Sequence, residues 1–199
     1  MIYSMEQTPK LQAPGAGLPL VQRIFLKLWL GPVTSKKTPA SDTRKLYESI
    51  NIKIIEKVSK IPTEKRNTKI LISPVHGLED SSRFWSLNGT LEHLLIVGKG
   101  LEGIILSLAA GKVPPTVIDI AQVKPSHPHQ SYLEEFQSYA PGLLTRIDAG
   151  LKKPGMNIDS TLTHLHPWFG PFTAKQWYWL LAAHQGLHYT QIKKIIRGL

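Results

Sequence analysis

The sequence predicts an all-α protein, an antiparallel bundle of four long helices with an additional helix at its N-terminal side. Apolar residues recur at spacings of three and four over several long segments, which is the period of an amphipathic helix. Capping residues precede these segments, and glycine or proline follows them. The connections between the segments are long enough to cross a bundle, which favours this architecture.

The composition is that of one globular domain. The chain has 199 residues, of which 42% are hydrophobic and 19% are charged, enough apolar residues for one sizeable core. It has no cysteine, which excludes a disulfide framework, a thiolate metal site and a catalytic cysteine. A chain without cysteine fits a reducing compartment, and we expect a cytoplasmic protein.

The N-terminal forty residues differ in character from the rest, so we divide the chain into an extension, residues 1–40, and a helical bundle, residues 41–199. The extension starts with a polar stretch rich in glycine and proline, unlike a secretory signal. Residues 18–30 are apolar but carry Arg23 and Lys27, and they are too few to span a membrane. They predict a short amphipathic helix packed on the bundle; a helix lying in a membrane interface is the alternative.

The positive charge is concentrated in one region. The formal net charge is +10, and residues 36–69 hold ten lysines and arginines against four acidic residues. Aromatic residues are not interleaved with these cations, there is no RNP-type motif, and the charges fall between apolar helix positions. We therefore predict a solvated basic face and no nucleic-acid partner.

The first two bundle helices are predicted from caps and prolines. Ser41 or Asp42 can cap a helix that ends near Ile61, just before a proline. The connection that follows, residues 63–80, contains the run KILIS, which could be a strand or extended packing. Because a single strand has no partner in view, we interpret it as a loop across the bundle. A second helix is expected from Ser81 or Ser82 to the glycine at 111. It is apolar almost all round, which indicates burial between neighbours.

The third and fourth helices have different signals. Ser131 and Glu134 suggest a capping box that opens the third helix, and Pro141 should kink or break it. The fourth helix is predicted over residues 173–198, with a capping box formed by Thr173 and Gln176. Cations gather in its last turn, where they suit the helix dipole, and its final glycine is a candidate C-terminal stop.

Histidines on the buried faces are the candidate metal ligands. His184 and His188 are four residues apart on one face of the fourth helix, which brings their Cβ atoms roughly 5–6 Å apart. Such a pair alone is more often hydrogen bonded than metal bound, so a third ligand is needed. His93 lies inside the second apolar helix, and facing bundle helices commonly place metal ligands in the core. The small residues Ser86, Gly89 and Thr90 near His93 leave room for a ligand, although they also suit close helix packing.

The remaining candidates are given less specific roles. Glu92 points about a quarter turn away from His93 and is a poor general base, better suited to a solvated face or an indirect contact. There is no HExxH motif, which disfavours a zincin-type peptidase. His127 and His129 are expected in an exposed loop, His76 at an entrance, and His164 and His166 on the approach to the last helix, with a hydrogen-bonding role for His166. The aromatic residues of that approach could roof a pocket or belong to the core: Trp168, Phe169 and Phe172.

Two stretches resemble the DinB-like superfamily, also called the YfiT-like metal-dependent hydrolases: FWSLNGTLEHLL at residues 84–95 and HPWFGPFTAKQWYWLLAAHQGLHYTQIKKI at residues 166–195. In that family a Trp-Ser pair and a histidine mark the second helix, and an HxxxH pair marks the fourth. The resemblance covers residues 41–199 and implies an antiparallel four-helix bundle with a divalent ion, commonly zinc or nickel, on three histidines. The positions that match are His93, His184 and His188.

The resemblance also implies a function. It points to a metal-dependent hydrolase or a thiol-dependent transferase acting on a small molecule, with a low-molecular-weight thiol such as mycothiol or bacillithiol in the second case. Three imidazoles leave open positions on the ion, where a bound water can reach a pKa of about 7. Water or thiol on the ion would then be the reacting group, and no catalytic side chain is assigned. A homodimer is compatible with this class.

A non-catalytic bundle is the alternative. Such a protein would keep the helical fold and use its basic surface to bind a partner or a nucleic acid. The complete set of three histidines favours the metal-dependent enzyme, and metal analysis of the purified protein separates the two classes.

Overall fold

The computed structural model describes residues 9–19, 22, 24, 37–115, 118–127 and 130–199. The described chain is mostly helical, with a few short strands. The α-helices are α3 (Ala40–Ser59), α4 (Leu87–Ala109), α5 (Leu133–Tyr139), α6 (Leu143–Leu151) and α7 (Ala174–Gly198). Two short 3-10 helices cover Thr63–Lys65 and Asp80–Ser82, and the strands are β1 (Ile70–Leu71), β2 (Phe84–Trp85), β3 (Thr163–His166) and β4 (Gly170–Thr173).

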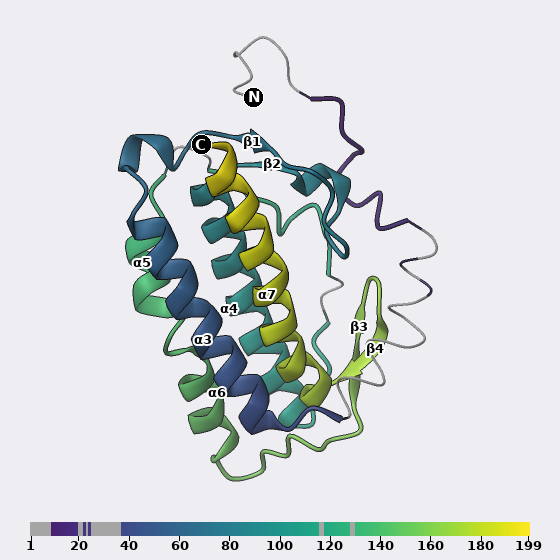
Figure 1. Cartoon of the computed structure of the whole chain (residues 1–199). Coiled ribbons are helices and arrows are strands. Elements are labelled where there is room, and N and C mark those ends of the chain that lie inside the picture. Colours follow the sequence, from purple (N-terminus) through teal and green to yellow (C-terminus); the bar gives the residue numbers. More distant parts are fainter. Residues whose placement is uncertain (1–8, 20–21, 23, 25–36, 116–117, 128–129) are drawn as a thin grey trace.

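Three long helices form the centre of the molecule. Helix α7 packs along both α3 and α4, and α5 and α6 lie end to end along the outer side of α3 and α4 (Figure 1). Two clusters of buried apolar side chains run along these contacts, one at each end of the long helices.

The helix directions differ from the predicted antiparallel packing. Tyr132, just before α5, donates its backbone N–H toward Asn88 at the start of α4, whereas Gly150 of α6 lies against Leu106 near the end of α4. Helices α5 and α6 therefore run parallel to α4, while α3 and α7 run the other way (Figure 1). The reason is the connection after α4, residues 110–132, whose described residues (110–115, 118–127 and 130–132) lie along the way back to the start of α4. We call it the crossover.

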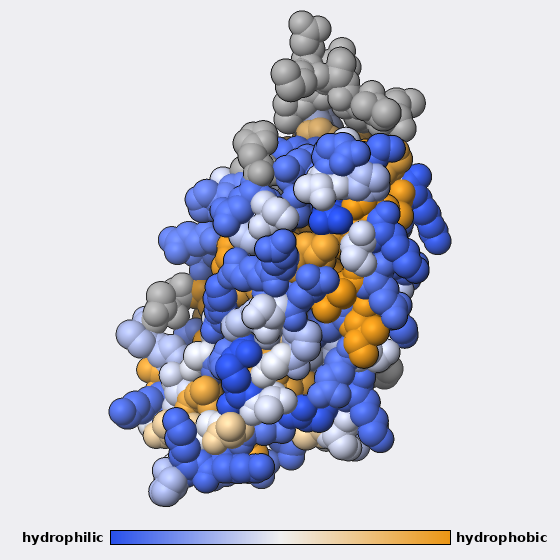
Figure 2. Space-filling view, turned by 90° about the vertical axis from the view of Figure 1, so that its left-hand side faces the viewer, coloured by the Kyte–Doolittle hydropathy of each residue, from blue (hydrophilic) through white to orange (hydrophobic). Residues whose placement is uncertain are grey.

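Helix α3 closely follows its prediction. The buried stripe that the apolar spacing indicated is present: Tyr47, Ile50, Ile54 and Val58. The predicted cap is wrong by two or three residues, because Pro39 occupies the N-cap position and Ser41 and Asp42 lie in the first turn. The lysines of α3 and of the segment after it are exposed, and the side of the molecule that carries α3 and α5 is mostly hydrophilic, with narrower apolar areas between (Figure 2).

The prediction for the KILIS run is wrong. Its residues Ile70 and Leu71 form β1, which pairs antiparallel with β2 at Phe84 and Trp85. These two aromatic residues were expected inside the second helix, which instead begins at Leu87. Ser86 is the N-cap, and its hydroxyl accepts a hydrogen bond from the Gly89 N–H. A pairing between segments separated by a loop has no local periodicity, so the sequence pattern did not reveal it.

The third helical segment is divided at the predicted proline. Helix α5 ends at Tyr139 and α6 begins at Leu143, so the break expected at Pro141 is confirmed. The capping box expected for Ser131 and Glu134 is absent, because α5 begins at Leu133 without a side-chain hydrogen bond at its N-cap.

Helix α7 has the predicted start and a different end. The Thr173 hydroxyl and the Gln176 side chain form the capping box. Gly198 is the last residue of the helix rather than a stop beyond it. Before α7, β3 and β4 form a hairpin that was not predicted, in which His166 is paired with Gly170; this glycine has a φ of +82°, a value that side chains disfavour.

The helix predicted over residues 18–30 lies largely outside the described residues, because residues 20–21, 23 and 25–36 are not described. The division of the chain at residue 40 stays a prediction. None of the helices in the described part of the chain has the length and apolar composition needed to cross a membrane.

Candidate metal centre

The structure brings the three predicted histidines together between α4 and α7. His93 comes from α4, and His184 and His188 come from successive turns of α7. One nitrogen from each ring lies within 4.8 Å of the others, and the ring centroids are 4.4–5.1 Å apart. His93 and His188 are buried, whereas His184 is partly exposed. Imidazole nitrogens at this separation can share one metal ion.

Hydrogen bonds to the far side of two rings determine which nitrogen faces the centre. His93 Nδ1 lies 2.6 Å from the carbonyl oxygen of Val123, and His188 Nδ1 lies 2.6 Å from Gln191 Oε1. Oxygen acceptors require a proton on each Nδ1, so both Nε2 atoms keep their lone pairs free. The Gln191 amide is itself oriented, because its Nε2 donates to the Ser82 carbonyl oxygen over 2.7 Å.

The third ring completes a donor set that fits a metal ion. His184 Nε2 lies 3.2 Å from His93 Nε2. Two nitrogens this far apart are within reach of one zinc ion, whose bonds to imidazole nitrogen are about 2.0–2.1 Å long. Three neutral imidazoles with two of them held by outer hydrogen bonds are a donor set that zinc and nickel accept.

The burial of the cluster keeps the rings neutral. Burial lowers the pKa of His93 to about 4, an effect that the hydrogen bond to Val123 only partly opposes. Burial also lowers the pKa of His184 and of His188 well below the usual value, and the neighbouring histidines lower both further. A metal ligand must be deprotonated, so the rings are in the form that binds a cation.

The short sheet β1–β2 covers the cluster with an aromatic ring. Trp85 of β2 is buried, stacks on His188 with ring centroids 6.1 Å apart, and lies 5.1 Å from His93. The Trp-Ser pair of the sequence therefore serves two roles: the Trp side chain packs on the histidines, and Ser86 caps the helix that carries His93.

The crossover is attached to the bundle at two places just after Val123. The buried carboxylate of Glu92 accepts hydrogen bonds from the backbone N–H groups of Ser126 and His127. Glu92 is therefore neither solvated nor directed at the histidines; it anchors the crossover. His127 is exposed, as predicted, although its ring also contacts Glu92 at 3.1 Å, and His129 lies outside the described residues.

A buried ion pair forms the other attachment. Lys124 Nζ lies 2.6 Å from Glu79 Oε2 and 2.7 Å from Ser82 Oγ. Burial raises the pKa of Glu79, but the ammonium of Lys124 and the backbone N–H groups of Gly17 and Gly15 together outweigh this effect, so the pKa is lowered overall. For Lys124 the balance is reversed: burial lowers the pKa of the ammonium more than Glu79 raises it. The N-terminal segment joins this group, because Gly17 N donates to Glu79 over 3.0 Å.

A cavity of about 340 Å³ adjoins the histidines. Its wall is mostly apolar and comes from α4, α7 and the crossover, including Ile96, Val97, Leu101, Ile104, Ile118, Leu180 and Leu187. The expected border of Ser86, Gly89 and Thr90 is wrong: the Thr90 hydroxyl donates to the Ser86 carbonyl oxygen, and Gly89 packs against Pro125 of the crossover. The small residues thus allow the crossover to approach α4 closely.

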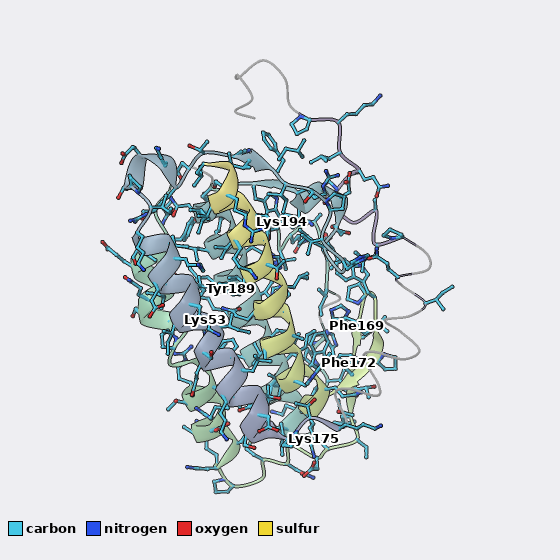
Figure 3. The ribbon with its side chains drawn as sticks, in the orientation of Figure 1. Lys53, Phe169, Phe172, Lys175, Tyr189 and Lys194 are labelled. Atoms are coloured by element: carbon cyan, nitrogen blue, oxygen red, sulfur yellow. The ribbon has the colours of Figure 1, made fainter. Side chains whose placement is uncertain are left out.

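A second, larger cavity of about 740 Å³ meets the first at His166 and His184. Its wall includes His76, as expected for a residue at an entrance, together with Trp168 and Phe169. Phe169 and Phe172 stack with centroids 5.3 Å apart beside α7 (Figure 3). Phe172 is fully buried core rather than a roof.

The residues that orient and cover the three histidines were not predicted from the sequence. Gln191 was visible, because it follows His188 by three residues and so lies on the same helix face. The roles of Val123 and Lys124 could not be predicted from the sequence pattern. Val123 acts through its backbone carbonyl oxygen, and Lys124 pairs with Glu79, 45 residues earlier in the chain.

Comparisons with protein-family models, curated proteins and solved structures found no match to this chain. The fold and the site themselves define a mostly helical protein in which three clustered histidines can hold a metal ion.

Proposed function

We propose that the protein is a DinB-like, divalent-metal-dependent enzyme that acts on a small molecule, with His93, His184 and His188 as the ligands of zinc or nickel. The resemblance of residues 84–95 and 166–195 to that family suggested this class. The observation that carries the proposal is the convergence of three neutral imidazoles, two of which are oriented by outer hydrogen bonds.

The arrangement around the ligands suits an enzyme better than a purely structural metal site. A structural zinc ion normally has four protein ligands, whereas a catalytic one commonly has three and an open position. Here the described chain offers three, and the partly exposed His184 faces both cavities. A divalent ion would supply Lewis acidity there, lowering the pKa of a coordinated water or thiol.

Hydrolysis is the first candidate reaction, and thiol-dependent transfer is the second. The two adjoining cavities support thiol-dependent transfer as a candidate, because a transfer needs space for two molecules near the same ion. In either case the apolar wall would bind the body of the substrate and exclude bulk water, while Trp85 and the crossover hold the ligand rings in place.

Metal content and two activity assays test the proposal. We expect purified protein to bind about one equivalent of zinc or nickel, measured by elemental analysis and titration calorimetry. The loaded protein should then hydrolyse a chromogenic ester or amide, or consume bacillithiol in the presence of an electrophile. The His188→Ala protein should lose metal and activity, and His127→Ala should keep both.

A folded protein that binds no divalent ion would contradict the proposal. That result, together with salt-sensitive binding of an anionic partner, would favour the non-catalytic bundle with a basic binding surface.

A further inference from the structure

His166 is one of the polar residues that line both cavities. It belongs to β3, and its ring lines both cavities next to His184. The ring is held by aromatic neighbours, with centroids 4.5 Å from Phe169 and 5.3 Å from Trp177. Its position relative to the metal ligands is therefore determined by the hairpin and by the first turns of α7.

The hairpin turn determines which nitrogen of His166 carries the proton. His166 Nδ1 lies 3.1 Å from the backbone nitrogen of Trp168 and 3.3 Å from that of Phe169. Both of these groups are N–H donors, so Nδ1 must accept and cannot carry a proton in the neutral ring. The ring proton is consequently on Nε2.

The Nε2–H group of His166 has no hydrogen-bond partner among the residues that the structure describes. The neighbouring cavity wall is mostly apolar, with Leu180 and Leu187 from α7 next to it. This N–H group is therefore available to an acceptor that enters the cavity, and a ligand can supply one.

The charges of the cavity wall indicate which kind of ligand group can accept from His166 Nε2–H. Among the described residues, Lys124 is the one lysine or arginine that lines either cavity, and its ammonium is paired with Glu79. A phosphate or another strongly charged anion would therefore meet no free cation from the described part of the wall. A neutral carbonyl oxygen needs only a neutral donor, which His166 provides.

We propose that His166 is a substrate-binding residue whose Nε2–H donates to the carbonyl oxygen of a small molecule with an apolar body in the adjoining cavity. This inference rests on the proposed function, because it takes the cavity beside the three histidines as the substrate site. The inference adds a substrate class, namely an amide, ester or ketone with an apolar body. It also names His166 as the residue that orients the carbonyl group of this substrate.

The test uses hexanamide as the probe and hexylamine as a matched compound without a carbonyl group. Nitrogen-15 NMR of the wild-type histidines should show a proton on Nε2 of His166, and hexanamide should shift that resonance while hexylamine does not. His166→Phe should weaken hexanamide binding about tenfold, the usual cost of one lost hydrogen bond. His166→Gln keeps an N–H group at the end of the side chain and should restore part of the affinity.

The wild-type spectra keep the test decisive even if the substitutions disturb the hairpin. A proton on Nδ1, equal binding of the two probes, or equal affinity of wild type and His166→Phe would overturn the inference. Each titration is made with zinc-loaded and with metal-free protein. If the protein binds zinc but His166→Phe binds hexanamide as tightly as wild type, this inference alone is refuted. If the protein does not bind zinc, the proposed function is refuted.

Discussion

At the scale of single residues, the three histidines are predicted to act as one ligand set. Replacing any of them with alanine, as in His93→Ala, leaves two ligands, and we expect the zinc affinity to fall more than about 100-fold, beyond the range typical of outer residues. Calorimetric titration measures the affinity. The fold should survive, since the two apolar clusters extend well beyond the site.

His127→Ala is the matched control for this series, because His127 is exposed and is not one of the clustered nitrogens. A His93→Ala protein with wild-type zinc affinity would show that the assignment of the ligands is wrong.

Gln191 contacts a candidate ligand without being one itself, so its role can be tested separately. Its Oε1 accepts from His188 Nδ1 and its Nε2 donates to the Ser82 carbonyl oxygen, so it orients the ring and selects the tautomer. Gln191→Leu should therefore lower zinc affinity about 10- to 100-fold while all three ligands remain. Gln130→Leu, at an exposed glutamine that does not line either cavity, serves as the control. Equal affinities of the two variants would count against an orienting role.

At the scale of elements, the crossover is the connection that completes the site. It supplies the Val123 carbonyl oxygen to His93, and it is attached through Glu92 and through Lys124. Its length also reverses the chain, so that α5 and α6 run parallel to α4. One connection thus determines both the topology of the bundle and the orientation of His93, one of the three clustered histidines.

The ion pair between Glu79 and Lys124 should make stability depend on pH. The folded-state pKa of Glu79 is lowered from 4.5, so its contribution is fully present above that value and is lost as the pH falls through the lower, folded-state pKa. Glu79→Gln removes this contribution and leaves a buried ammonium less well paired, at a cost of about 3 kcal/mol at neutral pH. Urea unfolding at a series of pH values measures both effects.

The wild-type protein should lose stability more steeply than Glu79→Gln below about pH 4.5, so that the two curves approach each other in acid. Glu134→Gln, at an exposed position on α5, is the control. Parallel curves for wild type and Glu79→Gln would contradict the assigned role.

At the scale of the whole molecule, the strong positive charge is predicted to be a solvated surface rather than a nucleic-acid site. The exposed lysines of α3 and the following segment alternate with buried apolar residues of the helix, and this side of the molecule is mostly hydrophilic (Figure 2). We expect no binding to single- or double-stranded DNA or RNA tighter than about 10 μM at physiological salt. Fluorescence anisotropy at several salt concentrations measures it, and micromolar binding that weakens steeply with salt would reverse the prediction.

Local signals in the sequence determined a large part of this protein. The buried stripe of α3, the capping box of α7 and the break at Pro141 each depend on residues within a few positions, and each is present in the structure. The three histidines could also be selected, because a pair four residues apart and a single histidine in an apolar helix are visible without any knowledge of the fold.

Only the tertiary structure decided the features that join distant segments. The pairing of β1 with β2, the parallel direction of α4 and α6, and the contact of Val123 with His93 depend on where the long connections run. Backbone groups and buried ion pairs across many residues have no periodicity that a sequence can display. The three candidate ligands could therefore be predicted from the sequence. The orientation of their rings, the packing of Trp85 on them and the shape of the adjoining cavities depend on the tertiary structure.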